Sequence, residues 1–124
     1  LNAQKRYVAG EAAGRRAVEL APEAPIAWCN LASALIGGKR FAEAEAACRK
    51  AIELERKTPE AWGNLGQALA EQFRLDEAEA AYTTALALDP GMASLHSGMA
   101  KVLLEKGASA EAAEESGWVI PDPR

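Results

Sequence analysis

The sequence contains one histidine, two cysteines and few aromatic residues, and these scarcities exclude several kinds of site. His96 has no second histidine with which to form a zinc site or a proton relay. Cys29 and Cys48 lack the short spacing of a metal-binding or redox pair. The Ser, Asp and Lys residues show no grouping of a nucleophile with a base and an orienting residue. We therefore expect no enzyme activity, no metal and no cofactor.

Basic charge and long apolar runs are also scarce. The chain carries 14 Lys and Arg against 18 Asp and Glu, for a net charge of −4, so it lacks the basic face that a nucleic-acid partner requires. It has no apolar run of about 18 residues and no signal-peptide pattern, so we expect no membrane insertion. Two cysteines without other stabilising cross-links favour a reducing, cytoplasmic location. The start at Leu1 indicates a fragment of a longer protein.

The sequence does contain an internal repeat, because residues 25–58 align with residues 59–92 when shifted by 34 positions. The aligned pairs include a proline, a tryptophan, an asparagine, two leucines and two alanines, at Pro25 and Pro59, Trp28 and Trp62, Asn30 and Asn64, Leu31 and Leu65, Leu35 and Leu69, Ala44 and Ala78, and Ala51 and Ala85. One structural unit is therefore written twice.

Each copy has the apolar period of two consecutive α-helices, which we call helix A and helix B. Trp62, Leu65, Gly66 and Leu69 lie at i, i+3, i+4 and i+7, on one side of a helix. A break at residues 37–40, or 72–74 in the second copy, precedes a new stripe that begins at Ala44 or Ala78. Small residues on the second stripe allow helix A and helix B to approach each other closely. The pattern predicts stacked helical hairpins.

The motif of Trp, Leu, a small residue and Leu, followed by alanines at fixed distances, resembles the tetratricopeptide repeat (TPR). The resemblance implies an all-α fold, an α-solenoid of antiparallel hairpins forming a TPR superhelix, and a protein-binding role. The first copy departs from it in having Cys48 where the second has Tyr82, and Arg56 where proline is common.

In the same register the whole chain, residues 1–124, forms a single TPR array. Residues 1–24 form a partial repeat that is mainly helix B, with the end of a helix A before Tyr7, and residues 25–58 and 59–92 are full repeats. Residues 93–124 form a degenerate terminal repeat in which His96 replaces the tryptophan as structural filler and Ser109 occupies a large-residue position. We expect residues 110–115 to form its helix B.

In the resembled family helix A lines a concave groove that holds a bound peptide. The positions of this chain that would face the groove form a second line beside the apolar stripe, and they are Cys29, Asn30, Ser33, Ile36, Gly63, Asn64, Gln67, Ala70, Ser97, Lys101 and Leu104. A solvated helix face is the alternative for this line. We expect Cys29 to be exposed and Cys48 to be a small buried residue.

The resemblance carries two further implications. Asn30 and Asn64 could hydrogen-bond the backbone of a ligand, as the asparagine ladder does in the TPR arm of O-GlcNAc transferases. Residues 28–32 also resemble that arm in sequence. In the third copy Gly98 interrupts the ladder. TPR domains that clamp a chaperone's terminal carboxylate use Lys, Asn and Arg at five positions. In this chain those positions are Cys29, Ser33, Asn64, Ser94 and Gly98, and only Asn64 matches. Without the cations a carboxylate would lack charge-assisted hydrogen bonds, so this role is set aside.

The sequence thus predicts a non-catalytic module that binds a protein or peptide segment in its concave groove. The alternatives are a non-catalytic arm of a larger, glycosyltransferase-like enzyme and a self-assembling scaffold. The scaffold is suggested by charge, because residues 1–58 carry ten Lys and Arg against seven Asp and Glu, whereas residues 59–124 carry four against eleven. Opposite charges at the two ends are compatible with head-to-tail self-association.

Overall fold

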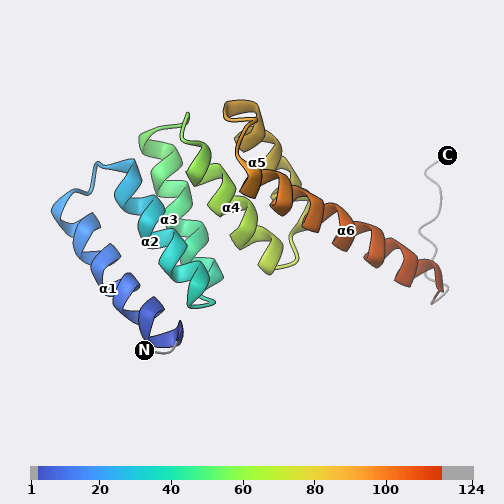
Figure 1. The fold of residues 1–124 in the computed structure, drawn as a ribbon, viewed down its shortest axis with the longest axis horizontal. Coiled ribbons are helices and arrows are strands. Elements are labelled where there is room, and N and C mark those ends of the chain that lie inside the picture. Colours follow the sequence, from blue (N-terminus) through green and yellow to red (C-terminus); the bar gives the residue numbers. More distant parts are fainter. Residues whose placement is uncertain (1–2, 116–124) are drawn as a thin grey trace.

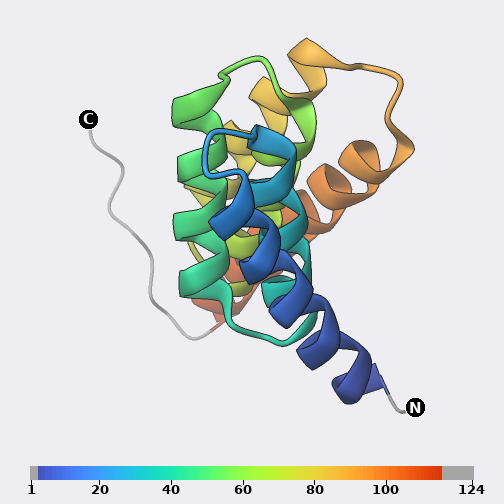
Figure 2. The ribbon, with the colours of Figure 1, turned by 90° about the vertical axis from the view of Figure 1, so that its left-hand side faces the viewer.

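A computed structural model describes the backbone of residues 3–115 and the side chains of residues 5–111, and all its regular elements in this range are α-helices. In chain order they are α1 (Ala3–Leu20), α2 (Pro25–Gly37), α3 (Phe41–Leu54), α4 (Pro59–Glu71), α5 (Leu75–Leu88) and α6 (Ala93–Glu115). The helices stack side by side from α1 to α6 (Figure 1), and Figure 2 views the stack from the α1 end. The all-α solenoid expected from the repeat is confirmed.

Helices α2 with α3, and α4 with α5, are the two predicted hairpins. Pro25 and Pro59 stand in the first turn of α2 and α4, where the missing proline N–H has no helical partner to lose. Each hairpin reverses at a residue in the left-handed region, Lys39 with φ 63° and Phe73 with φ 59°. These two positions lie one repeat apart, so the same backbone turn is used twice.

The residue at the tryptophan position fixes the loop that precedes each helix A. Trp28 Nε1 donates to the Pro22 carbonyl at 2.9 Å, and Trp62 Nε1 donates to the Arg56 carbonyl at 2.8 Å. His96 Nε2 lies 2.8 Å from the carbonyl of Pro90, the same six residues back, although its side chain is exposed. His96 therefore repeats the tryptophan's polar contact without its packing.

The predicted stripes form the core. Leu31, Leu35, Leu65 and Leu69 are at most 4% exposed. The alanines that face them from helix B are fully buried, at Ala44, Ala51, Ala78 and Ala85, so the helices approach closely over small side chains. The two tryptophans are half-buried and pack against the edge of this cluster.

The two outer segments differ from the sequence prediction. No turn separates a helix A from a helix B near residue 5 or residue 107, and α1 and α6 each run through without a break. The predicted helix B at residues 110–115 is wrong as a separate element, because these residues continue α6. Ser109 stands where Phe41 and Leu75 anchor helix B in the full repeats, and without an apolar anchor a reversal gains too little burial to replace helical hydrogen bonds. Residues 116–124, the rest of the predicted terminal repeat, lie outside the described residues.

Candidate functional site

The eleven predicted groove residues lie on α2, α4 and α6, but they do not share one environment. Exposed are Asn30, Ser33, Gln67, Ser97, Lys101 and Leu104; half-buried are Asn64 and Ala70; buried are Cys29, Ile36 and Gly63. The last three are covered by neighbouring helices rather than open to solvent, although Gly63 still borders the hollow between α4 and α6. Helix A of one repeat packs against helix A of the next, and this contact covers part of the predicted line.

Cys29 shows how this covering works. It is 3% exposed and packs with Ala51 and Ala61, against Trp28 and Ile52. Burial, helped by the charge of Glu60, raises the pKa of the Cys29 thiol to about 11. The expectation of an exposed Cys29 was wrong, because its position turns toward α4 rather than toward solvent.

Gly63 and Ile36 are covered in the same way. A Cβ atom at Gly63 would lie 2.6 Å from Leu95 Cδ2, so α6 rests directly on the backbone of α4 there. Ile36 is 8% exposed and belongs to the main core. Cys48, expected to be buried, is fully buried, and burial raises the pKa of its thiol to about 12.

The asparagine positions have a structural use within the array. Asn64 Nδ2 donates to the Cys29 carbonyl at 3.2 Å and so joins α4 to α2. Gly98 stands one repeat later, and a Cβ atom there would lie 2.5 Å from Tyr82 Cζ. The predicted interruption of the ladder at Gly98 thus has a packing reason, since the Tyr82 ring occupies the space that a side chain would need.

Two surface hollows contain five of the eleven predicted residues, and the exposed or half-buried Ala70, Ser97, Lys101 and Leu104 line neither of them. A hollow of about 120 Å³ lies between α4 and α6 and is lined by Glu60, Gly63, Asn64, Gln67, Tyr82, Met92, Ser94 and Leu95. A larger groove of about 490 Å³ lies between α1 and α2 and includes Asn30 and Ser33. Lys101 pairs with Glu71 at 3.6 Å. The arrangement offers amide, hydroxyl and apolar contacts over three successive helices.

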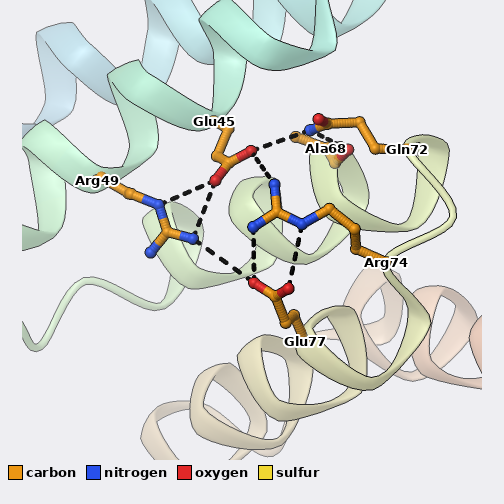
Figure 3. Close-up of polar contacts among 6 residues, drawn as sticks. All are labelled: Glu45, Arg49, Ala68, Gln72, Arg74 and Glu77. Carbon is orange, nitrogen blue, oxygen red and sulfur yellow. Dashed lines mark hydrogen bonds and ion pairs between the residues drawn. The ribbon is translucent and has the colours of Figure 1, made fainter.

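A network of charged residues that sequence reasoning missed joins neighbouring repeats (Figure 3). Glu45 on α3 accepts hydrogen bonds from Arg74 Nη1 at 2.7 Å, from Gln72 Nε2 at 3.1 Å and from Arg49 Nε at 3.1 Å. Arg74 also pairs with Glu77 at 2.7 Å. Burial alone would raise the pKa of Glu45, but these hydrogen bonds and charges outweigh it and hold the pKa below the usual value.

The same network occurs one repeat earlier. Glu11 on α1 pairs with Arg15 and with Arg40 from the hairpin turn, and Arg40 and Arg15 also pair with Glu43. We call each set an inter-repeat clasp, Glu11–Arg40 and Glu45–Arg74. The signal was present in the sequence, since the charged residues recur at the same spacing of 34 as the apolar ones.

The described residues were also compared with the requirements of a metal site and of a membrane-spanning helix. Among them no group of three or more His, Cys, Asp or Glu side chains could hold a metal ion. None of the helices placed by the structure is long and apolar enough to cross a membrane.

Comparison with known proteins identifies the family. Two models of the tetratricopeptide repeat match, one over residues 1–69 and one over residues 59–92. No curated protein sequence matches the chain.

Solved structures share the fold over most of the chain. The first TPR domain of Spaghetti (RPAP3), bound to the HSP90 peptide SRMEEVD, has a TM-score of 0.77 at 27% identity over 84% of this chain and 82% of that chain. The first TPR domain of human RPAP3 has a TM-score of 0.76 at 27% identity, over 91% and 85%. The Arabidopsis OM64 TPR domain has 0.74 at 26% identity, over 79% and 81%. The repeat, the hairpins and the family models agree, and the chain belongs to the tetratricopeptide repeat family.

Proposed function

We propose that this chain is a non-catalytic binding module whose exposed face on α2, α4 and α6 holds an extended peptide or a segment of another protein. The observation that carries the proposal is the line of exposed polar side chains that recurs from helix to helix, Asn30 and Ser33 on α2, Gln67 on α4, and Ser97 on α6. A similar TPR domain, the first of RPAP3, is bound to a peptide, which supports the same use here.

The charge of this face favours a neutral or basic peptide over an acidic terminus. Among the described residues that line the hollow between α4 and α6, Glu60 is the only charged one. Lys101, a cation on the same line, already pairs with Glu71 at 3.6 Å. Of the five positions that would clamp a terminal carboxylate in the resembled domains, Cys29 is buried and three are Ser or Gly. A carboxylate there would lack charge-assisted hydrogen bonds.

Gln67 is the best probe of binding. Its side chain is exposed and lines the hollow. Asn64 is less suitable, because Asn64→Ala would also remove the bond to the Cys29 carbonyl and lower stability.

The experiment is selection from a random peptide library displayed on phage, followed by fluorescence anisotropy of a selected peptide and of SRMEEVD. We expect the selected peptides to be neutral or basic and to bind more tightly than SRMEEVD. Gln67→Ala and Glu60→Ala should each weaken the selected peptide about two- to tenfold. Glu53→Ala, an exposed change outside the hollow, is the matched control and should have no effect. Selected peptides that end in acidic residues, or affinity unchanged by both groove variants, would contradict the proposal.

A further inference from the structure

The side of α4 opposite the proposed peptide-binding face carries another pair of surface hollows. Their volumes are about 420 Å³ and about 190 Å³, and Arg49 and Trp62 line both of them. At about 100° per residue, the α4 residues that line this pair stand across the helix from those of the hollow between α4 and α6, with Trp62, Leu65 and Leu69 on one side and Glu60, Gly63, Asn64 and Gln67 on the other. We call the larger member of the pair the Trp62 hollow.

The Trp62 hollow has an apolar floor and a charged rim. Its lining residues are Arg49, Ile52 and Glu53 on α3, Arg56 in the loop that follows, and Trp62 on α4. Ile52 and Trp62 are half-buried, so an apolar side chain of a ligand can be buried against them. The bond from Trp62 Nε1 to the Arg56 carbonyl, at 2.8 Å, fixes the indole, and a surface that is already ordered loses less freedom on binding.

Two of the three charged residues on the rim are already paired. Arg49 pairs with Glu45 at 3.0 Å (Figure 3), and Glu53 lies 4.0 Å from Lys50. Arg56 differs, because its guanidinium has no hydrogen-bond or ion-pair partner among the described residues. A ligand that suits both the floor and the rim therefore supplies an apolar side chain together with a carboxylate, which forms charge-assisted hydrogen bonds with a guanidinium.

The loop that carries Arg56 does not need an arginine. Pro22 and Pro90 stand 34 residues before and after it, in the same turn, and their carbonyls make the same contact, with Trp28 and with His96. A proline in a compatible turn also stabilises a chain by restricting its unfolded state. The arginine forgoes this benefit, and its guanidinium makes no described contact that would explain its presence. A ligand outside the array accounts for it.

We propose that the Trp62 hollow binds a short segment of another protein in which a bulky apolar residue stands next to Asp or Glu. The apolar side chain packs on Trp62 and Ile52, and the carboxylate pairs with Arg56. Glu53, whose side chain is 73% exposed on the same rim, repels this carboxylate and weakens the contact. The hollow thus takes an acidic segment, whereas the opposite face of α4 takes a neutral or basic one, so the chain holds two different partners at once.

The test is an NMR titration of the 124-residue chain, labelled with nitrogen-15, with three blocked tripeptides. The peptides are acetyl-Asp-Leu-Asp-amide, acetyl-Asn-Leu-Asn-amide and acetyl-Asp-Ser-Asp-amide, so the carboxylates and the apolar side chain are tested separately. The indole N–H signal of Trp62 reports binding. The signal of Trp28 is an internal control, because its N–H makes the same bond to a loop carbonyl and Pro22 stands there in place of the arginine.

We expect acetyl-Asp-Leu-Asp-amide to shift the Trp62 signal more than the other two peptides do, and more than it shifts the Trp28 signal. Arg56→Gln should raise the dissociation constant of this peptide about two- to fivefold, as expected for an exposed ion pair, and Glu53→Gln should lower it. Lys57→Gln is the matched control, since Lys57 is the next residue, is exposed and does not line the hollow. It should leave the dissociation constant close to that of the wild type.

Equal affinity for the three peptides, an equal shift at Trp28, or a Lys57→Gln variant that matches Arg56→Gln overturns the proposal. Melting temperatures establish that each variant is folded. Gln67→Ala should not affect this peptide, and Arg56→Gln should not affect the phage-selected peptides, so failure of one face is distinguished from failure of the other. Self-association of the wild type without peptide, if Arg56→Gln abolishes it, assigns the hollow to a second copy of the chain and also overturns the proposal.

Discussion

The Tyr82 ring packs between Gly66 on α4 and Gly98 on α6. We therefore expect two otherwise similar substitutions, Gly98→Ala and Gly107→Ala, to have opposite effects on stability. Gly98 and Gly107 both lie inside α6. An alanine is ordinarily favoured over glycine in a helix interior by about 0.5 to 1 kcal/mol. A Cβ atom at Gly107 meets nothing within 4 Å, so Gly107→Ala should raise the free energy of unfolding by about that amount.

Gly98→Ala should act in the opposite direction. Its Cβ atom would lie 2.5 Å from Tyr82 Cζ and 2.6 Å from the Tyr82 hydroxyl oxygen. The ring cannot swing aside freely, since it is 6% exposed and also packs against Gly66 on α4, where a Cβ atom would come within 2.9 Å of it. Overpacking of this kind costs about 1 to 3 kcal/mol, which exceeds the helix gain. We expect a net loss of about 1 to 2 kcal/mol.

Urea denaturation followed by circular dichroism measures both variants, and a double-mutant cycle tests the cause. Tyr82→Cys installs the residue that stands at the equivalent position, Cys48. In that background Gly98→Ala should lose its penalty, with a coupling energy of about 1 kcal/mol or more. If Gly98→Ala stabilises the chain as much as Gly107→Ala does, Tyr82 does not pack against Gly98 and the reasoning is refuted.

Three further outcomes are expected. Leu65→Ala, at a 2% exposed core position, should lower the free energy of unfolding by about 2 to 5 kcal/mol, while Leu104→Ala at an exposed position should change it by less than about 0.5 kcal/mol; equal effects in urea denaturation would contradict the assignment of the core. Because hydrogen bonds hold the pKa of Glu45 below its usual value, its contribution to stability is present above the unfolded pKa of about 4.3 and is lost as pH falls through the lower folded pKa. Unfolding measured across this range should therefore be less pH-dependent in Glu45→Gln, and an unchanged slope would count against the clasp. Cys29 and Cys48, with pKa values raised to about 11 and about 12, should react with a thiol reagent at pH 8 far more slowly in the folded chain than in urea, and fast labelling of the native protein would show that the thiols are accessible.

The fold could be predicted from the sequence because the repeat gives the same evidence twice. Trp28 and Trp62, or Leu35 and Leu69, mark the same faces in both copies, and chance seldom repeats a whole apolar stripe. The two outer segments, residues 1–24 and 93–124, depart from the repeat pattern and so lack this duplicated evidence. The reversal expected at residue 107 depends on burying an apolar residue at position 109, and the serine there removes that gain, which register alone does not weigh.

The candidate site was predicted less well. Alignment placed Cys29 beside Asn30 on one helix side, but which of them faces solvent depends on the angle at which α4 crosses α2. The crossing buries Cys29 under Ala61 and leaves Asn30 exposed. The Asn64 bond to the Cys29 carbonyl depends on the same angle. A periodic pattern gives the direction of a side chain around its own helix but not the position of the neighbouring helix.

The inter-repeat clasps carry a consequence for how arrays of this kind change in length. Each clasp takes a glutamate from one unit and an arginine from the next, and it reaches no further along the chain. Loss of residues 25–58 would therefore bring Glu11 opposite Arg74, and duplication of those 34 residues would add one more glutamate opposite one more arginine, so the new boundary would reproduce an old one. A segment one residue longer or shorter would turn the following helix by about 100° and bring different side chains to each boundary. Selection acting on these few charged pairs would thus favour gain or loss of whole units and oppose smaller insertions within the helices.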